Sequence, residues 1–175
     1  PSRLLEGDHA AHFLTERFDR RNGKKVHIQT LAAMNPSADS YEALFDTAFR
    51  IGVPPGELRQ LFRSMVLNVL SRNVDDHNKN FSFLMDRDGR WHVAPAYDYT
   101  FSVDPDAPYY VNRHSMTVNN KTEGITAADL LEVARRYDIK AAEPFIEKAI
   151  GIVSHYPEYG REAGVGEEWI KTIEI

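Results

Sequence analysis

Side chains of the types that bind metal ions or move protons gather at residues 73–80, which read Asn-Val-Asp-Asp-His-Asn-Lys-Asn. Asp75 and Asn80 have the spacing Asp-x-x-x-x-Asn, in which protein kinases place the acceptor of the substrate hydroxyl proton and an amide ligand of magnesium. Asp98 follows 18 residues after Asn80, and hard oxygen ligands suit Mg²⁺. The pattern predicts phosphoryl transfer, with Asp75 as the base, Asn80 and Asp98 as metal ligands, and Lys79 placed to neutralise phosphate charge.

Each of these residues taken alone has an ordinary structural interpretation. Asp75 and Asp76 are typical of a turn after a helix, and Asp98 is typical of a loop turn. A single histidine such as His77 more often makes a structural hydrogen bond than binds a ligand. The order of the elements is more specific, because a helix, the Asp-x-x-x-x-Asn loop, a hairpin and then a carboxylate follow one another.

A long helix before this loop and a hairpin after it would hold the polar groups in place. Apolar residues cover a broad face of residues 56–71, which predicts a mostly buried helix. Residues 81–85 and 90–94 are short apolar runs around the turn 86–89, which predicts a hairpin. Prolines and turn formers then predict a loop over 95–108.

The segments before this region predict a hairpin and a helix. Asn22-Gly23, between residues 13–20 and 25–30, is a strong hairpin signal because both turn residues tolerate positive φ. Asp39 followed by Glu42 predicts a helix start with a capping box.

The tail predicts further helices, so that the chain as a whole should be a mainly helical α+β fold. Thr126 with Asp129 predicts a second capping box. Residues 141–155 and 165–174 are expected to form two more helices.

Bulk composition excludes several classes of protein. The chain has 175 residues, 42% of them hydrophobic, which suits one globular domain. Its formal net charge of −5 argues against nucleic acid as the main partner. The absence of cysteine excludes disulfides and thiolate metal sites. No stretch approaches the ~20 apolar residues that span a bilayer, so we expect a cytoplasmic protein without membrane contact.

The central motifs resemble those of the HipA family of kinases. Residues 68–82 resemble that family's catalytic loop. Residues 94–98, Ala-Pro-Ala-Tyr-Asp, resemble its metal-binding segment, which stands where ordinary kinases have Asp-Phe-Gly. Residues 16–20 resemble the hinge whose backbone holds adenine, and residues 114–126 also resemble the family. The likeness covers most of the chain.

The resemblance implies a bacterial toxin kinase that uses ATP and Mg²⁺ to phosphorylate serine or threonine on a protein substrate. The base and the metal ligands keep the roles given above. The backbones of Glu16 and Phe18 become adenine contacts and Asp19 a ribose contact, while Gln29 and His77 are weaker candidates for nucleotide contact. A HipB-like DNA-binding antitoxin is the implied partner, and DNA would be contacted through that complex.

The resemblance also implies that residues 1–175 form the C-terminal domain of such a kinase, with a kinase-like C-terminal lobe. Its parts would be a hinge hairpin over 1–35, the helices, catalytic loop and metal loop over 36–108, and a helical region over 109–175. A kinase needs a lysine on the nucleotide phosphates, but residues 1–15 contain none. We therefore expect the N-terminal lobe elsewhere in the same chain or in a second chain, and no activity from this chain alone.

Two other interpretations stay open at this point. Asp75, Asp76, His77 and Asp98 could hold two cations in a metal-dependent hydrolase. A non-catalytic interaction module could instead bind a partner protein through exposed tyrosines. The candidates for such contacts are Tyr109, Tyr110, Tyr156 and Tyr159.

Overall fold

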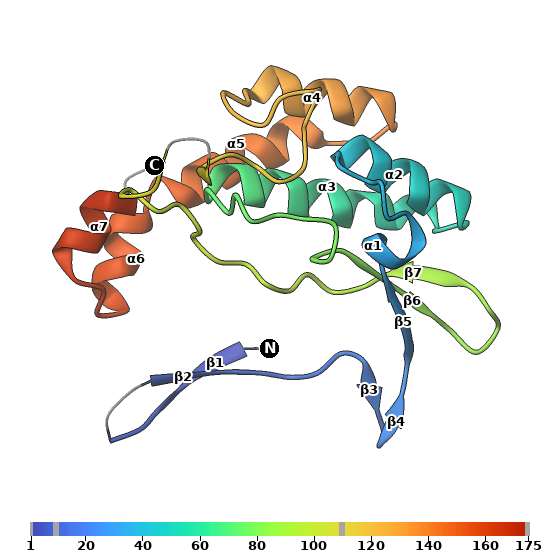
Figure 1. Cartoon of the computed structure of the whole chain (residues 1–175), viewed down its shortest axis with the longest axis horizontal. Helices are drawn as coiled ribbons and strands as arrows, with labels where there is room; N and C mark the ends of the chain where they lie inside the picture. The colour runs from blue at the N-terminus through green and yellow to red at the C-terminus, as the bar shows by residue number, and fades with distance from the viewer. Residues whose placement is uncertain (1, 9–10, 109–110, 174–175) are drawn as a thin grey trace.

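The computed structural model describes residues 2–8, 11–108 and 111–173. Within these ranges the chain forms an α+β fold of seven helices and three small antiparallel sheets, which confirms the predicted fold class (Figure 1). The helices are α1 (Leu31–Met34), α2 (Tyr41–Arg50), α3 (Pro55–Leu70), α4 (Ala127–Arg136), α5 (Ala142–Val153), α6 (Tyr156–Glu162) and α7 (Glu167–Ile173). None of the helices in these ranges is long and apolar enough to cross a membrane.

The strands form three separate sheets. The first pairs β1 (Ser2–Glu6) with β2 (Ala11–Thr15), and the second pairs β3 (Arg20–Arg21) with β4 (Lys24–Lys25). The third has the order β5-β6-β7, from β5 (His27–Thr30), β6 (Ser82–Met85) and β7 (Trp91–Val93). The predicted hairpin over 81–94 is therefore present, and β5 extends it to three strands.

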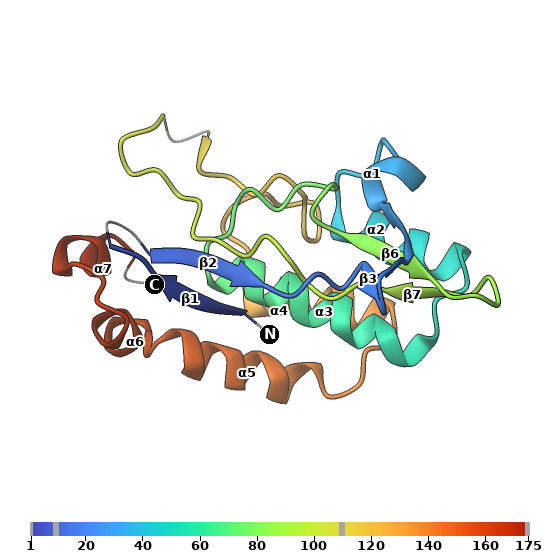
Figure 2. The same cartoon turned by 90° about the horizontal axis from the view of Figure 1, so that it is seen from below.

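Helix α3 is the buried centre of the molecule, as its apolar face predicted. Leu61, Phe62, Met65 and Val66 are at most 2% exposed, and burial of each such side chain contributes about 1.5–3 kcal/mol. Helices α2 and α5 and strand β7 contact α3, and Figures 1 and 2 show α3 running between α5 on one side and the β5-β6-β7 sheet on the other. The loop that follows α3 thus starts from a deeply buried helix.

The N-terminal hairpin prediction was correct at its turn and wrong in its extent. Asn22 and Gly23 have φ values of 50° and 74°, as a two-residue hairpin turn requires. The strands beside them have two residues each. Residues 11–15 pair with β1 instead, and residues 27–30 pair with β6, because backbone donors in a strand pair with whichever edge tertiary packing brings near.

One predicted helix start shifts by a residue. Ser40, rather than Asp39, is the N-cap of α2, and its Oγ accepts from the backbone N–H of Ala43 at 3.1 Å. Glu42 does not close a capping box, because its Oε1 accepts from the backbone N–H of Asn119 at 2.9 Å.

The second capping box is confirmed at α4, where Thr126 and Asp129 bond reciprocally. The Asp129 carboxylate also accepts from Lys121 Nζ and Asn119 Nδ2, both at 2.9 Å. Led by the bond from Lys121, these contacts hold the pKa of Asp129 far below its usual range. The cap of α4 therefore also fastens the preceding loop.

The tail contains one helix more than the sequence predicted. Helices α5 and α7 lie inside the expected ranges 141–155 and 165–174, but α6 was missed. Its seven residues contain Pro157 and Gly160, which usually indicate a loop. Gly160 lies close to α7, since a Cβ there would be only 3.1 Å from Ile170 Cγ1.

A pH-dependent contact joins the start of α3 to the β6–β7 hairpin. His92 Nδ1 lies 2.8 Å from Glu57 Oε1, and its Nε2 lies 3.3 Å from Asp86 Oδ2. The hydrogen bonds to Glu57 first, and to Asp86 second, raise the pKa of His92. The charged imidazole therefore stabilises the fold fully below its unfolded pKa of about 6.5, and that contribution is lost as pH rises through the higher folded pKa.

We expect the difference in unfolding free energy between the wild-type chain and His92→Gln to shrink as pH rises from roughly 5 to 9. Urea unfolding at each pH measures this difference. His155→Gln is the matched control, because the His155 imidazole contacts the carbonyl of Gly151 at 2.6 Å rather than carboxylates. A difference that stays constant across this range would contradict a role for the charged imidazole.

Candidate active site

The loop after α3 brings the two ends of the Asp-x-x-x-x-Asn segment together. Asn80 Nδ2 donates to the backbone carbonyl of Asp75 at 2.9 Å. The Asp75 side chain is 67% exposed, so its carboxylate is open to a second molecule. His77 lies beside it, with Nε2 3.9 Å from Asp75 Oδ1. The segment thus presents one open carboxylate next to an oriented amide.

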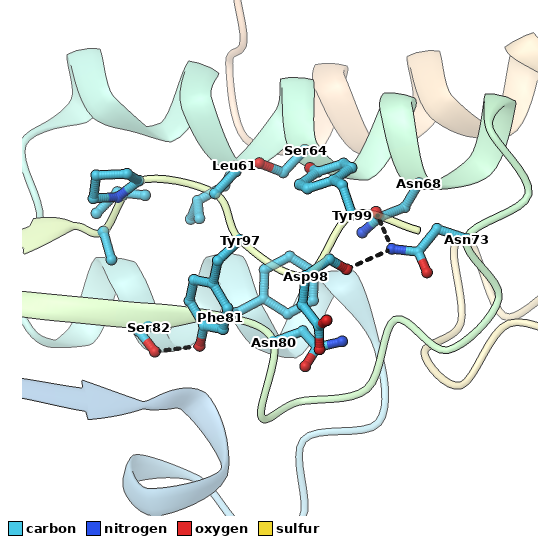
Figure 3. Close-up of a pocket in the computed structure, with 14 residues that line it drawn as sticks. Leu61, Ser64, Asn68, Asn73, Asn80, Phe81, Ser82, Tyr97, Asp98 and Tyr99 are labelled. Atoms are coloured by element: carbon cyan, nitrogen blue, oxygen red, sulfur yellow. Dashed lines mark hydrogen bonds between the residues drawn. The ribbon is translucent and has the colours of Figure 1, made fainter. Parts of the chain in front are cut away.

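Asp98 has an unusual backbone and shares a cavity with Asn80. Its φ of 58° lies in the left-handed region, which aspartate and asparagine tolerate better than most residues. Both residues line a small cavity of about 20 Å³, and Figure 3 shows their side-chain ends in the same part of it. Carboxylate and amide oxygens are a donor set that suits Mg²⁺. The two predicted metal ligands, 18 residues apart in the sequence, therefore line the same cavity.

A cleft of about 720 Å³ adjoins this cavity. Residues 16–19 line one part of it and residues 97–99 another, together with Ile28, Thr30 and Lys79. Its volume is in the range of small-molecule sites. Four of the predicted nucleotide-contact residues, Glu16, Phe18, Asp19 and Lys79, are among the residues that line it.

Tyr97 links the loop that carries Asp98 to residues 79–82 across this cleft. Its hydroxyl donates to the carbonyl of Lys79 at 2.7 Å and lies 2.5 Å from Ser82 Oγ. Its ring lies against that of Phe18, with centroids 5.8 Å apart. Burial raises the pKa of the Tyr97 phenol. The Tyr97 hydroxyl therefore holds the backbone next to Asp98 against residues 79–82.

Asp19 lines the cleft with a carboxylate that is already engaged. It accepts from Arg17 Nη2 at 2.7 Å and from Arg20 Nη1 at 2.5 Å. The hydrogen bond from Arg17 is the largest cause of the lowering of its pKa to about 2. A sugar hydroxyl would have to compete with two guanidinium groups for these oxygens, so the structure weakens the predicted ribose contact.

Gln29 and His77 do not lie where nucleotide contact was expected. Ile28 and Thr30 line the cleft, and because side chains alternate along a strand, Gln29 points to the opposite face of β5. His77 is next to Asp75 and outside the cleft lining. The predictions for these two residues find no support in the geometry.

Asp76 is a buried hub that sequence reasoning missed. Its carboxylate is 0% exposed and accepts from the Tyr41 hydroxyl at 2.7 Å, from His114 Nδ1 at 2.9 Å, and from the backbone N–H groups of Ser115 and Met116 at 2.8 and 3.3 Å. Burial first, and the Asp76 charge second, raise the pKa of Tyr41 well above its usual value. Asp76 thus fastens the loop after α3 to α2 and to residues 114–116.

This hub removes the support for a two-cation hydrolase. That interpretation needed Asp76 as a ligand, but its oxygens bind donors of the protein itself. Within residues 2–8, 11–108 and 111–173, no group of three or more histidine and acidic side chains could hold a metal ion. The hydrolase interpretation is therefore disfavoured.

The tyrosines of the interaction-module interpretation have separate positions. Tyr156 and Tyr159 line an apolar groove of about 340 Å³ between the metal loop and the C-terminal helices. Tyr159 is 50% exposed. Tyr109 and Tyr110 lie outside the residues that the structure describes.

Comparison with known proteins gives the family and the fold. No curated protein matches the sequence significantly. Among solved structures, the HipA chain from the complex of HipA, HipB and operator DNA of the Shewanella oneidensis MR-1 toxin–antitoxin system has a TM-score of 0.70 and 18% sequence identity. The match covers 99% of this chain and 49% of that one, so the chain spans about half the length of that HipA. The sequence model of the HipA-like C-terminal domain matches residues 1–157. Because that match extends over most of its length, the chain belongs to the family of HipA-like C-terminal domains.

Proposed function

We propose that the chain is the catalytic lobe of a serine/threonine protein kinase that uses ATP and Mg²⁺ and acts as the toxin of a HipA-type toxin–antitoxin pair. The observation that carries this proposal is the meeting of Asn80 and Asp98 at one cavity, beside a 720 Å³ cleft lined by residues 16–19. Membership of the HipA-like family supports the class of protein. The implied fold is then that of a kinase-like C-terminal lobe.

The residues of the site have distinct proposed roles. Asp75 accepts the proton of the substrate hydroxyl, for which its exposed carboxylate is suited. Asn80 and Asp98 would hold magnesium, and the bound ion would neutralise charge on the nucleotide phosphates. The Nδ2–H of Asn80 is turned to the carbonyl of Asp75, so its amide oxygen is directed elsewhere and is available as a ligand.

The cleft would take the nucleotide base. Residues 16–19 offer backbone groups along it, and the rings of Phe18 and Tyr97 form an apolar lining that suits a flat aromatic base. Lys79, also in the lining, would lie near the phosphates.

The partners proposed for the chain follow from the family. A HipB-like antitoxin would bind it, as HipB accompanies the S. oneidensis HipA, and DNA would be contacted through that complex. The chain spans 49% of the HipA that it matches, and phosphoryl transfer would need a lysine on the nucleotide phosphates from an N-terminal lobe, in the same or a second polypeptide. Purified alone, the chain should show no ATP turnover; magnesium-dependent turnover that Asp75→Ala abolishes would refute that expectation.

Nucleotide binding tests the proposed function directly. We expect a non-hydrolysable ATP analogue with Mg²⁺, at about 100 times its Kd, to stabilise the chain by ~2.7 kcal/mol. For a chain of this size the melting temperature would rise by roughly 5–11 °C. EDTA should remove most of the shift. No shift, or one independent of Mg²⁺, would contradict the kinase proposal and favour an interaction module that uses the groove at Tyr156 and Tyr159.

A further inference from the structure

Asn73 is a buried amide whose polar atoms all have partners close to the candidate site. The residue is 2% exposed. Its Nδ2 donates to Asn68 Oδ1 at 3.0 Å and to the carbonyl of Asp98 at 3.2 Å. Its Oδ1 accepts from Ser102 Oγ at 3.1 Å. Figure 3 shows Asn73 between α3 and the metal loop, with dashed lines to Asn68 and Asp98.

One arm of this network holds the backbone of Asp98. A residue other than glycine at a φ of 58° costs of order 1 kcal/mol or more and persists where its surroundings fix it. The bond from Asn73 to the Asp98 carbonyl is such a constraint. Loss of this bond would let residue 98 relax and would turn its carboxylate away from Asn80.

The other arm reaches the backbone of Asp75. Ser102 Oγ donates to Asn73 Oδ1 and accepts from the Asp75 N–H, each at 3.1 Å. Ser102 lies in the loop that also carries Asp98, so the Asn73 side chain connects the backbones of Asp75 and Asp98. Asn73 reaches the Asp75 backbone through two hydrogen bonds, by way of Ser102, and the Asp98 backbone through one.

The amide is itself anchored to the core of the fold. Asn68, 3% exposed on α3, donates from Nδ2 to the Tyr41 hydroxyl at 2.9 Å, and that hydroxyl donates to Asp76. A buried network in which every member has its partners is rigid. The position of Asn73 is therefore fixed from α2 and α3 as well as by the loops that it joins.

We propose that Asn73 is the positioning residue that sets the spacing between the proton acceptor Asp75 and the metal ligand Asp98. The inference rests on the function proposed above. The C-cap of α3 is Ser71 and not Asn73, so capping of this helix does not account for the buried Asn73 amide. Removal of a group that holds a metal ligand in place typically weakens metal affinity by about 10- to 100-fold.

Three variants separate this role from a general contribution to stability. Asn73→Ala cuts both arms. Ser102→Ala cuts the arm to Asp75 and keeps the backbone bond from Ser102 to the Arg72 carbonyl. Asn78→Ala is the matched control, because that amide of the same loop donates to the carbonyls of Pro36 and Ala38 and not to the site.

The readouts are calorimetric titration of the chain with a non-hydrolysable ATP analogue, in Mg²⁺ and in EDTA, and amide hydrogen exchange at Asp75. In Mg²⁺, Asn73→Ala should bind about 10-fold more weakly, with affinity in EDTA unchanged. In Ser102→Ala the Mg²⁺-dependent affinity should be unchanged. The backbone amide hydrogen of Asp75 should exchange with solvent about 10-fold faster than in the wild-type chain. Asn78→Ala should change neither quantity.

The outcomes distinguish the inference from the proposed function. A wild-type chain without Mg²⁺-dependent binding would overturn the proposed function. Wild-type binding that depends on Mg²⁺, with Asn73→Ala equal to Asn78→Ala, would overturn the positioning role alone. If Asn73→Ala fails to fold, Ser102→Ala decides, since unchanged exchange at Asp75 would then overturn the inference.

Discussion

The Asp98→Asn variant should lose the magnesium-dependent part of its nucleotide affinity and keep its fold. Asparagine has the same size and tolerates the left-handed φ of 58°, so the change removes the charge without new backbone strain. A carboxylate lost from a divalent cation should weaken binding about 100-fold, or ~2.7 kcal/mol. Calorimetric titration with the ATP analogue in Mg²⁺ and in EDTA measures the loss, and affinity in EDTA should not fall.

The matched control is Asp138→Asn, because Asp138 also has a positive φ, of 53°, and lies after α4, outside the cleft. It should leave both affinities and the melting temperature unchanged. A collapse of the melting temperature in Asp98→Asn would instead indicate that residue 98 is structural. Equal weakening with and without magnesium would indicate that Asp98 touches the nucleotide and not the metal.

The Asp76→Asn variant should be the most destabilising exchange of a carboxylate for an amide in the loop that follows α3. Both carboxylate oxygens of Asp76 accept hydrogen bonds in a fully buried position, and an amide would turn an N–H₂ group toward donors. Each buried group left without a partner costs about 1–3 kcal/mol, so we expect a loss of ~3 kcal/mol in the free energy of unfolding. The melting temperature should then fall by roughly 6–12 °C.

Asp75→Asn is the control one residue away. That side chain is 67% exposed, and surface changes of this kind are usually within about 0.5 kcal/mol. Urea unfolding of both variants measures the contrast. Equal stabilities would show that the Asp76 hub adds nothing to the fold and that its burial has another cause.

Local sequence signals predicted much of the fold correctly. The turn at Asn22-Gly23, the capping box at Thr126 and the burial of α3 depend on side-chain and backbone preferences over a few neighbouring residues. The N-terminal strands were mispaired because strand partners are chosen by distant edges, and β5 pairs with β6, more than fifty residues later. The short helix α6 was missed because packing against α7 overrides its proline and glycine.

The sequence by itself determined which residue types the candidate site contains and the order in which helix, loop, hairpin and acid follow one another. The tertiary structure decided which member of the adjacent pair Asp75-Asp76 is open to solvent and which is fully buried. Spacing cannot distinguish two neighbouring carboxylates in a loop. Their environments differ because hydrogen-bond donors 35 to 40 residues away, on Tyr41 and residues 114–116, converge on the carboxylate of Asp76. The carboxylate of Asp75 is left exposed to solvent.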